Sequence, residues 1–146
     1  MKKLIAMAAM AAMAFGAIAG EHDTPQASGD YARLEAGEAV FAGNIAAVGT
    51  NGCAYAVNTS AVGGTLTVCG VFLHSAAKGE NVTVQRGGFI LENATGAGAI
   101  AKKDIGATAY SVATNPWTVT KTSGTKTVGK VADVRDDGSV VVVVGR

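Results

Sequence analysis

The sequence has no run of basic residues, and this absence limits the partners that the protein can have. Lys and Arg number 12 and Asp and Glu number 11, which gives a formal net charge of +1 at pH 7. Nucleic acids and anionic membrane surfaces are bound through clustered positive charge. The scattered charges therefore argue against a nucleic-acid partner.

Cysteine is scarce, with Cys53 and Cys69 as the two residues of this type. Neither belongs to a CxxC or Cys/His motif, so the sequence predicts no metal site. A disulfide between them is possible if the chain is exported, and would add on the order of 3 kcal/mol by restricting the unfolded chain. We favour two free thiols, because Cys69 lies within the apolar run TLTVCGVFL and needs no other role.

Catalytic groups are also lacking. The chain has two histidines, His22 and His74, and His74 stands beside Ser75 without a third residue to orient it. A Ser-His neighbour pair is not a triad, which is recognised by geometry. Glu35 and Glu38 are close in sequence, but solvated charges on an edge explain them better than an acid and base pair. The sequence predicts no catalytic residue, no cofactor and no small-molecule substrate.

Small apolar residues and glycine are abundant, and they favour strands and tight turns. Apolar residues make up 49% of the chain, aromatic residues only 5%, and Gly occurs 20 times. Short apolar runs alternate with turn residues, and this spacing predicts an all-β fold, a small β-barrel or β-tulip-like sandwich. The expected strands fall within residues 39–48, 53–57, 65–73, 81–87, 88–93, 107–112, 118–122, 127–134 and 139–145.

Two features near the C-terminus sharpen this prediction. Residues 135–138, RDDG, have the chemistry of a tight hairpin turn because Gly accepts positive φ. The run Val140–Val144 that follows is apolar on both faces, so both sides need cover. We expect it to be an interior strand of a closed barrel; a partner subunit covering one face is the alternative.

The N-terminus resembles a secretory signal. Residues 1–19 pair two lysines with an apolar stretch and end in a small-x-small motif, which predicts cleavage after Ala19. The alternative is a retained helical arm. The polar segment that follows has no apolar periodicity, so we expect a flexible N-terminal arm over residues 20–35 and the β domain over residues 36–146.

Four segments in order resemble the capsid cement, or head decoration, proteins of tailed bacteriophages and their prophages. They are AGEAVFAGNIAAVGTNGCAYAV from Ala36, VCGVFLHSAAKGENVTVQRGGFILEN from Val68, DIGATAYSV from Asp104, and TVTKTSGTKTVGKVADVRDDGSVVVVVGR from Thr118. The family pattern contains KGE-x-V-x-V-x-R-G, IG-x-x-AY and a closing G-x-V-x-D-V-x-x-DG-x-V-x-V. The motifs describe turns and strands, and their order along the chain carries the resemblance.

The resemblance implies a structural protein on the virion capsid surface, a homotrimer that binds the major capsid protein and stabilises its lattice. It also implies that the N-terminal arm contacts the capsid, with Tyr31, Arg33 and Leu34 as candidate anchors because aromatic and Arg side chains dominate interface hot spots. The leader departs from this family, since a head assembled in the cytoplasm needs no secretory signal. The alternative is an exported small β-barrel that binds a partner in the periplasm or at the cell surface.

Overall fold

The computed structural model describes residues 31–123 and 125–145 of the chain. The chain divides into two units, Met1–Tyr31 and Ala32–Arg146, and the second holds the β fold. The expected leader, residues 1–19, and the part of the expected arm at residues 20–30 lie outside the described residues. The last five residues of that arm, Tyr31–Glu35, form a β-strand instead of a flexible segment.

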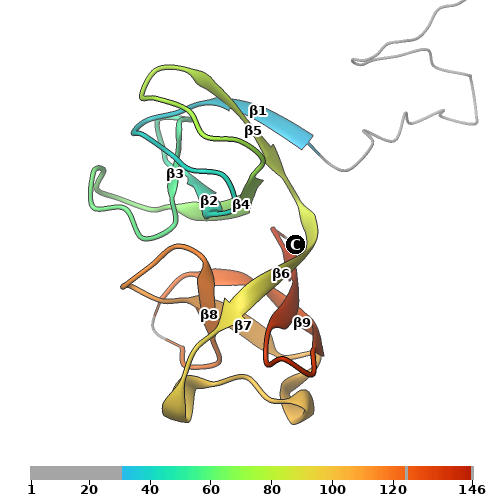
Figure 1. Cartoon of the computed structure of the whole chain (residues 1–146). Helices are drawn as coiled ribbons and strands as arrows, with labels where there is room; N and C mark the ends of the chain where they lie inside the picture. The colour runs from blue at the N-terminus through green and yellow to red at the C-terminus, as the bar shows by residue number, and fades with distance from the viewer. Residues whose placement is uncertain (1–30, 124, 146) are drawn as a thin grey trace, which may run out of the picture. The chain divides into compact units, whose positions relative to one another are not determined.

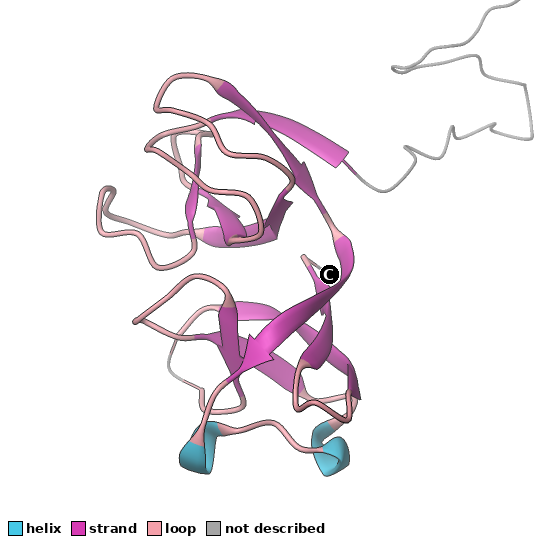
Figure 2. Cartoon of the chain, viewed as in Figure 1, coloured by secondary structure: helices cyan, strands magenta, loops and turns pink. Residues whose placement is uncertain are grey.

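The fold is all-β, as the sequence predicts (Figure 2). Each of the expected runs contains a strand, and the strand missing from that prediction is the first. In chain order the described strands are β1 (Tyr31–Glu35), β2 (Ile45–Val48), β3 (Ala54–Ala56), β4 (Thr67–Phe72), β5 (Asn81–Gln85), β6 (Gly87–Asn93), β7 (Thr108–Ser111), β8 (Thr118–Thr120), β9 (Thr127–Val134) and β10 (Val140–Val144). Two single 3₁₀ turns, η2 (Gly96–Gly98) and η3 (Lys102–Asp104), lie between β6 and β7.

Strands β1–β5 form one sheet, the N-terminal sheet, in the order β1-β5-β4-β2-β3 (Figure 1). Strand β2 pairs antiparallel with both β3 and β4. The two ends of the sheet also meet, because Ala36, directly after β1, forms a bridge with Ala54 at the start of β3. This single bridge closes the sheet loosely.

Strands β6–β10 form a closed barrel in the order β10-β6-β8-β7-β9. Strand β10 pairs antiparallel with β6 on one side and with β9 on the other. The prediction that Val140–Val144 is an interior barrel strand is therefore confirmed. Its side chains alternate, with Val140, Val142 and Val144 fully buried and the other two half-buried.

The hairpin predicted at residues 135–138 is confirmed as the turn between β9 and β10. The amide of Arg135 donates to the carbonyl oxygen of Ser139 at 2.8 Å, and the amide of Gly138 donates to the carbonyl of Arg135 at 2.9 Å. Gly138 has a φ of +90°, which glycine adopts without the Cβ clash of other residues. The turn chemistry therefore determined this connection.

The two sheets follow one another almost without interruption, since only Arg86 separates β5 from β6. Gly87, with a φ of +135°, is the first residue of β6, where the chain leaves the N-terminal sheet and enters the barrel. Figure 1 shows this continuous path from the N-terminal sheet to the barrel.

Buried side chains form two clusters. The barrel cluster consists of Ile45, Val57, Val71, Leu91, Ile100, Ala109, Val119, Val128, Val131, Val134, Val140, Val142 and Val144. The sheet cluster consists of Ala36, Val40, Ala46, Ala54, Phe72, Ala76, Val82 and Val84. Consecutive residues on β2 and on β4 enter different clusters, because neighbouring side chains of a strand point to opposite faces. Strands β2 and β4 therefore lie between the two cores.

Candidate binding surface

A surface hollow of about 420 Å³ lies beside the N-terminal sheet and the loop that precedes β8. Its lining includes Glu38, Phe41, Asn58 and Trp117. Phe41 is 60% exposed and Trp117 is 47% exposed, so two large aromatic side chains border it in contact with solvent. We call this feature the Phe41–Trp117 hollow.

Glu38 is fixed in place at the hollow. One carboxylate oxygen, Oε2, accepts a hydrogen bond from the amide of Ala56 at 3.0 Å, and the other, Oε1, accepts from the hydroxyl of Thr59 at 2.8 Å. The interpretation of Glu38 as a solvated edge charge is wrong, because the residue is half-buried and its carboxylate binds the end of β3 and the loop that follows it. Glu35, by contrast, is exposed at the end of β1.

Backbone hydrogen bonds at Pro116 and Trp117 hold the position of Trp117. The carbonyl of Pro116 accepts a hydrogen bond from the amide of Ile45 at 2.7 Å, and the carbonyl of Trp117 accepts from the amide of Glu92 at 3.2 Å. Pro116 is buried. The loop before β8 is therefore held against both β2 and β6, and the indole is displayed from a fixed backbone.

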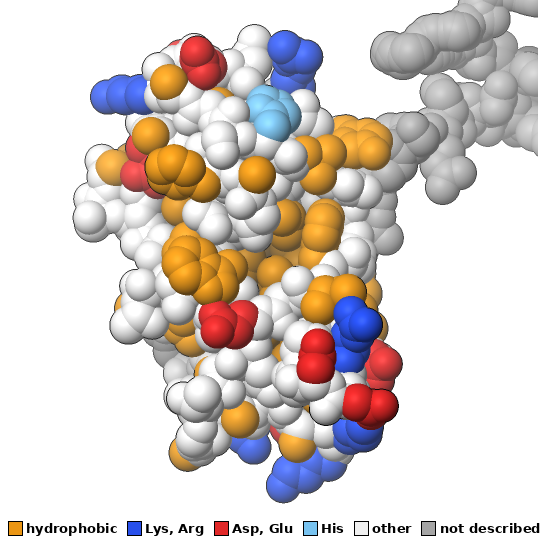
Figure 3. Space-filling model, viewed as in Figure 1, with side chains coloured by type: hydrophobic (Ala, Val, Ile, Leu, Met, Phe, Trp, Pro, Cys, Tyr) orange, Lys and Arg blue, Asp and Glu red, His pale blue; other side chains and the backbone are white. Residues whose placement is uncertain are grey.

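Apolar side chains gather across the middle of one face of the molecule (Figure 3). Large hydrophobic residues that remain exposed in the described chain are Tyr31, Phe41, Leu73, Ile90, Ile105 and Trp117, each at least 41% exposed. Exposed apolar side chains that form a patch mark an interaction surface more often than single ones do. The two aromatic residues at the hollow are the strongest such group.

The candidate anchors of the arm lie on strand β1, the first strand in the order of the N-terminal sheet. Tyr31 is 49% exposed and Arg33 is also exposed. Leu34 is half-buried and packs against the sheet cluster. Side chains of a strand alternate between faces, so Leu34 fastens β1 to the core while Tyr31 and Arg33 are presented outward.

Cys53 and Cys69 are both free, so the disulfide considered from the sequence is not formed. Cys53 directly precedes β3 and Cys69 lies on β4, and β2 runs between these strands. Neighbouring strands are about 4.8 Å apart, so strands on either side of a third are roughly 10 Å apart. A disulfide needs Cα atoms within about 7 Å. Burial raises the pKa of the Cys69 thiol to about 11, partly opposed by the charge of Arg86.

His74 uses both ring nitrogens within the fold. Nε2 accepts a hydrogen bond from the amide of Thr83 at 3.1 Å, so the neutral ring carries its proton on Nδ1, which lies 3.1 Å from the carbonyl oxygen of Ser75. The hydroxyl of Ser75 accepts from the amide of Ala42 at 3.1 Å instead of approaching His74 as a nucleophile. These contacts give the pair a structural role.

Asp137 caps the hairpin turn between β9 and β10. Its Oδ1 accepts hydrogen bonds from the hydroxyl of Ser139 at 2.6 Å and from the amide of Ser139 at 2.9 Å. These bonds hold the pKa of the Asp137 carboxyl below its usual value. Asp137 therefore stabilises the turn that the sequence predicts here.

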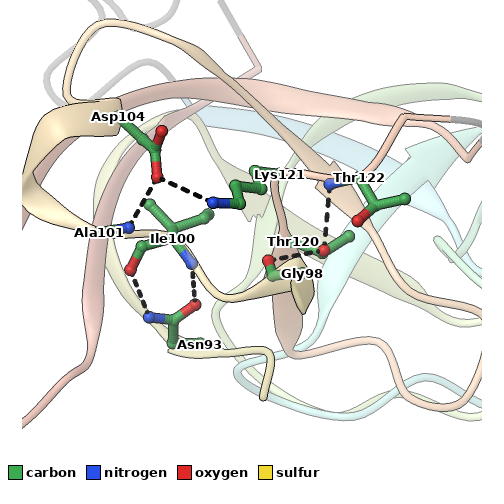
Figure 4. A network of polar contacts seen from close by, with 8 residues as sticks. All are labelled: Asn93, Gly98, Ile100, Ala101, Asp104, Thr120, Lys121 and Thr122. Atoms are coloured by element: carbon green, nitrogen blue, oxygen red, sulfur yellow. Dashed lines mark hydrogen bonds and ion pairs between the residues drawn. The ribbon is translucent and has the colours of Figure 1, made fainter. Parts of the chain in front are cut away.

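A polar network holds the long connection between β6 and β7 (Figure 4). The side chain of Asn93 donates to the carbonyl of Ile100 and accepts from its amide, both at 2.8 Å. Asp104 accepts from the amide of Ala101 at 2.8 Å and lies 3.8 Å from the ammonium of Lys121. Asn93 also donates to the carbonyl of Gly138 at 3.1 Å, so the network ties this connection to β6, to Lys121 directly after β8 and to the β9–β10 turn.

The described residues hold neither a candidate metal site nor a membrane-spanning helix. No group of three or more His, Cys, Asp or Glu side chains in residues 31–123 and 125–145 is arranged to hold a metal ion. Within the same part of the chain, no helix has the length and hydropathy needed to span a membrane. No protein-family model matches the chain, and comparisons with curated proteins and with solved structures gave no match.

The sequence did not predict the Phe41–Trp117 hollow. Its residues come from three separate segments, at positions 38–44, 56–60 and 116–117, and no spacing rule connects segments this far apart. One signal was available: Trp117 is the single tryptophan of the chain and follows Asn115-Pro116 in a turn. A large aromatic residue placed in a turn, outside the apolar alternation, is a candidate for surface recognition.

Proposed function

We propose that the protein is a structural capsid decoration protein, which binds the outer surface of a phage head and stabilises the lattice of its major capsid protein. The ordered set of motifs that resembles this family supports this role. In the fold, these motifs fall on β5, on β7 and on the β9–β10 hairpin. They therefore belong to the β framework, and none of them includes the residues proposed to contact the capsid.

The observation that carries the proposal is the outward display of Tyr31 and Arg33 from β1. This strand is the first described element, and it follows directly on the N-terminal segment expected to reach the capsid. Tyr and Arg are among the residues most enriched at interface hot spots. The anchoring of β1 through Leu34 reduces the backbone entropy that is lost when these two side chains bind.

Binding to the assembled head accounts for the stabilisation. A protein that binds only the expanded lattice lowers the free energy of that state by mass action. We propose that it binds as a homotrimer, because linked contacts raise the overall affinity without any new contact type. No catalytic group takes part in this proposal.

Co-sedimentation of the full-length protein with expanded tailed-phage heads prepared from its native source tests the proposal. Wild type is expected to sediment with the heads, and the double variant Tyr31→Ala/Arg33→Ala is expected to bind at least tenfold more weakly. The matched control is Ile105→Ala/Arg135→Ala, which removes an exposed apolar and an exposed cationic side chain from the barrel. Failure of wild type to sediment, or equal losses in both double variants, would contradict the proposal.

An exported binding protein is the second candidate, favoured by the signal-like residues 1–19. N-terminal sequencing of the protein recovered from its native source separates the two. A mature chain beginning at Gly20 and recovered outside the cytoplasm supports export. An intact N-terminus in purified virions supports the decoration protein.

A further inference from the structure

We propose that the Phe41–Trp117 hollow binds a neutral saccharide. Its volume of about 420 Å³ lies within the range of small-molecule sites, roughly 300–1,000 Å³. Such sites combine aromatic surface with a few fixed polar groups that set orientation. The hollow has both, and each fits a different part of a sugar.

The aromatic part of the hollow fits the apolar face of a pyranose ring. Trp117 is 47% exposed and Phe41 is 60% exposed, although large aromatic side chains gain most from burial. The C–H groups on one face of a pyranose carry partial positive charge, and an aromatic face carries partial negative charge. The backbone on both sides of Trp117 is hydrogen-bonded to β2 and β6, so the indole is displayed from a rigid support.

The polar part fits hydroxyl groups. Glu38 is held by its two hydrogen bonds and its oxygens retain further lone pairs for a ligand hydroxyl. Asn44 and Ser60 form no side-chain hydrogen bond within the described residues, and the amide nitrogen of Asn58 makes one long contact of 3.4 Å with the carbonyl of Ala113. Amide and hydroxyl groups both donate and accept, as sugar hydroxyls do.

The charge of the hollow favours an uncharged ligand. No Lys or Arg lines it, and Glu38 is its one ionisable residue. An anionic ligand would meet the carboxylate of Glu38 without a compensating cation. A methylated ammonium ligand would satisfy the carboxylate and the aromatic faces, but it has no hydrogen-bonding group to offer to Asn44, Asn58 and Ser60. A neutral saccharide can contact the aromatic faces, the carboxylate, and the amide and hydroxyl side chains.

Tryptophan fluorescence measures saccharide binding at the hollow directly, because Trp117 is the single tryptophan of the full chain. Full-length protein is titrated with maltotriose, cellotriose and tri-N-acetylchitotriose, and isothermal titration calorimetry repeats each titration. At least one saccharide is expected to change the emission of Trp117 with saturation below about 10 mM, a weak but measurable affinity. No saturable change with any of the three would overturn the proposal.

Variants test whether the saccharide binds at the Phe41–Trp117 hollow. Trp117→Ala and Asn58→Ala are each expected to weaken the affinity measured by calorimetry at least tenfold. Ile90→Ala, which removes another exposed apolar side chain on β6, is the matched control and is expected to change it less than twofold. Equal affinities in all variants would overturn the proposal. So would tighter binding of tetramethylammonium or of a proline-rich peptide than of any of the three saccharides.

Head binding is measured separately from saccharide binding, so the two proposals fail independently. Tyr31→Ala/Arg33→Ala is expected to retain saccharide affinity. Trp117→Ala is expected to retain sedimentation with heads.

Discussion

The N-terminal sheet and the barrel reach stability by different means. In the barrel, five strands close by continuous hydrogen-bonded pairing, and valine provides most of the buried side chains of the barrel cluster. In the N-terminal sheet, closure depends on the bridge between Ala36 and Ala54, and the sheet cluster has Phe72 as its one large side chain among alanines and valines. The barrel distributes its stability over many similar contacts, whereas the sheet depends on a few.

The residues that close the barrel and the residues proposed to bind partners also lie in different parts of the molecule. The motifs on β7, β9 and β10 serve to close the barrel. The Phe41–Trp117 hollow and the outward side chains of β1 belong mainly to the loops and edge of the N-terminal sheet. A rigid element that supports loops carrying recognition groups is a common division of roles. The largest mutational effects on stability and on binding should therefore occur at different positions.

Phe72→Ala should have the largest effect on stability, because it removes the single large side chain of the sheet cluster. Phe72 is 1% exposed, and the loss expected for a buried Phe→Ala change is about 4 kcal/mol of unfolding free energy. Val142→Ala, at an equally buried barrel position, is expected to cost about 2 kcal/mol. Urea unfolding of the two variants measures both. Equal losses would remove the distinction between a concentrated and a distributed core.

Gly129→Ala should destabilise the barrel by about 2 to 3 kcal/mol, because an added Cβ meets the backbone carbonyl of Val143 on the neighbouring strand. The matched control is Gly88→Ala on β6, where an added Cβ has no atom within 4 Å. The control is expected to change the unfolding free energy by less than about 0.5 kcal/mol. Urea unfolding again provides the comparison, and similar losses at both glycines would contradict tight closure at Gly129.

Cys69, in the N-terminal sheet, should make the unfolding free energy of the protein fall at alkaline pH. Its pKa rises from 9.0 to about 11 on folding because the thiol is buried. Between these values the unfolded chain loses the thiol proton while the folded chain keeps it, so stability falls as the pH rises. The wild type should lose up to about 2 kcal/mol relative to Cys69→Ala between pH 9 and pH 11. Parallel pH profiles of unfolding under reducing conditions would contradict this.

Substitution of Asp137 should have the smallest effect on the unfolding free energy, and the pH dependence of this effect should appear in acid. Its pKa is lowered by the hydrogen bonds from Ser139, so its contribution is present above the pKa of the unfolded carboxyl and is lost as the solution is acidified below it. Asp137→Asn is expected to lower stability slightly at pH 7 and to match wild type at pH 2. A difference of equal size at both pH values would show that the ionised carboxylate is not the stabilising form.

The sequence by itself determined most of the β framework. Alternating valines, glycine-containing turns and the RDDG hairpin act over a few residues, so the strands between β2 and β10 could be located from local patterns. The interior position of Val140–Val144 followed from its two apolar faces. Strand β1 was missed because YARLE has one half-buried side chain, Leu34, and shows no clear alternation.

Only the tertiary structure decided how distant segments meet. It separated Cys53 from Cys69 by a strand, bound Glu38 to Ala56 and Thr59, and brought Trp117 to the same hollow as Phe41. These outcomes depend on strand order and on loop closure, which local residue patterns do not encode. The physical reason is that turn and strand preferences act between neighbours in the chain, whereas a binding surface is set by packing between residues far apart in it.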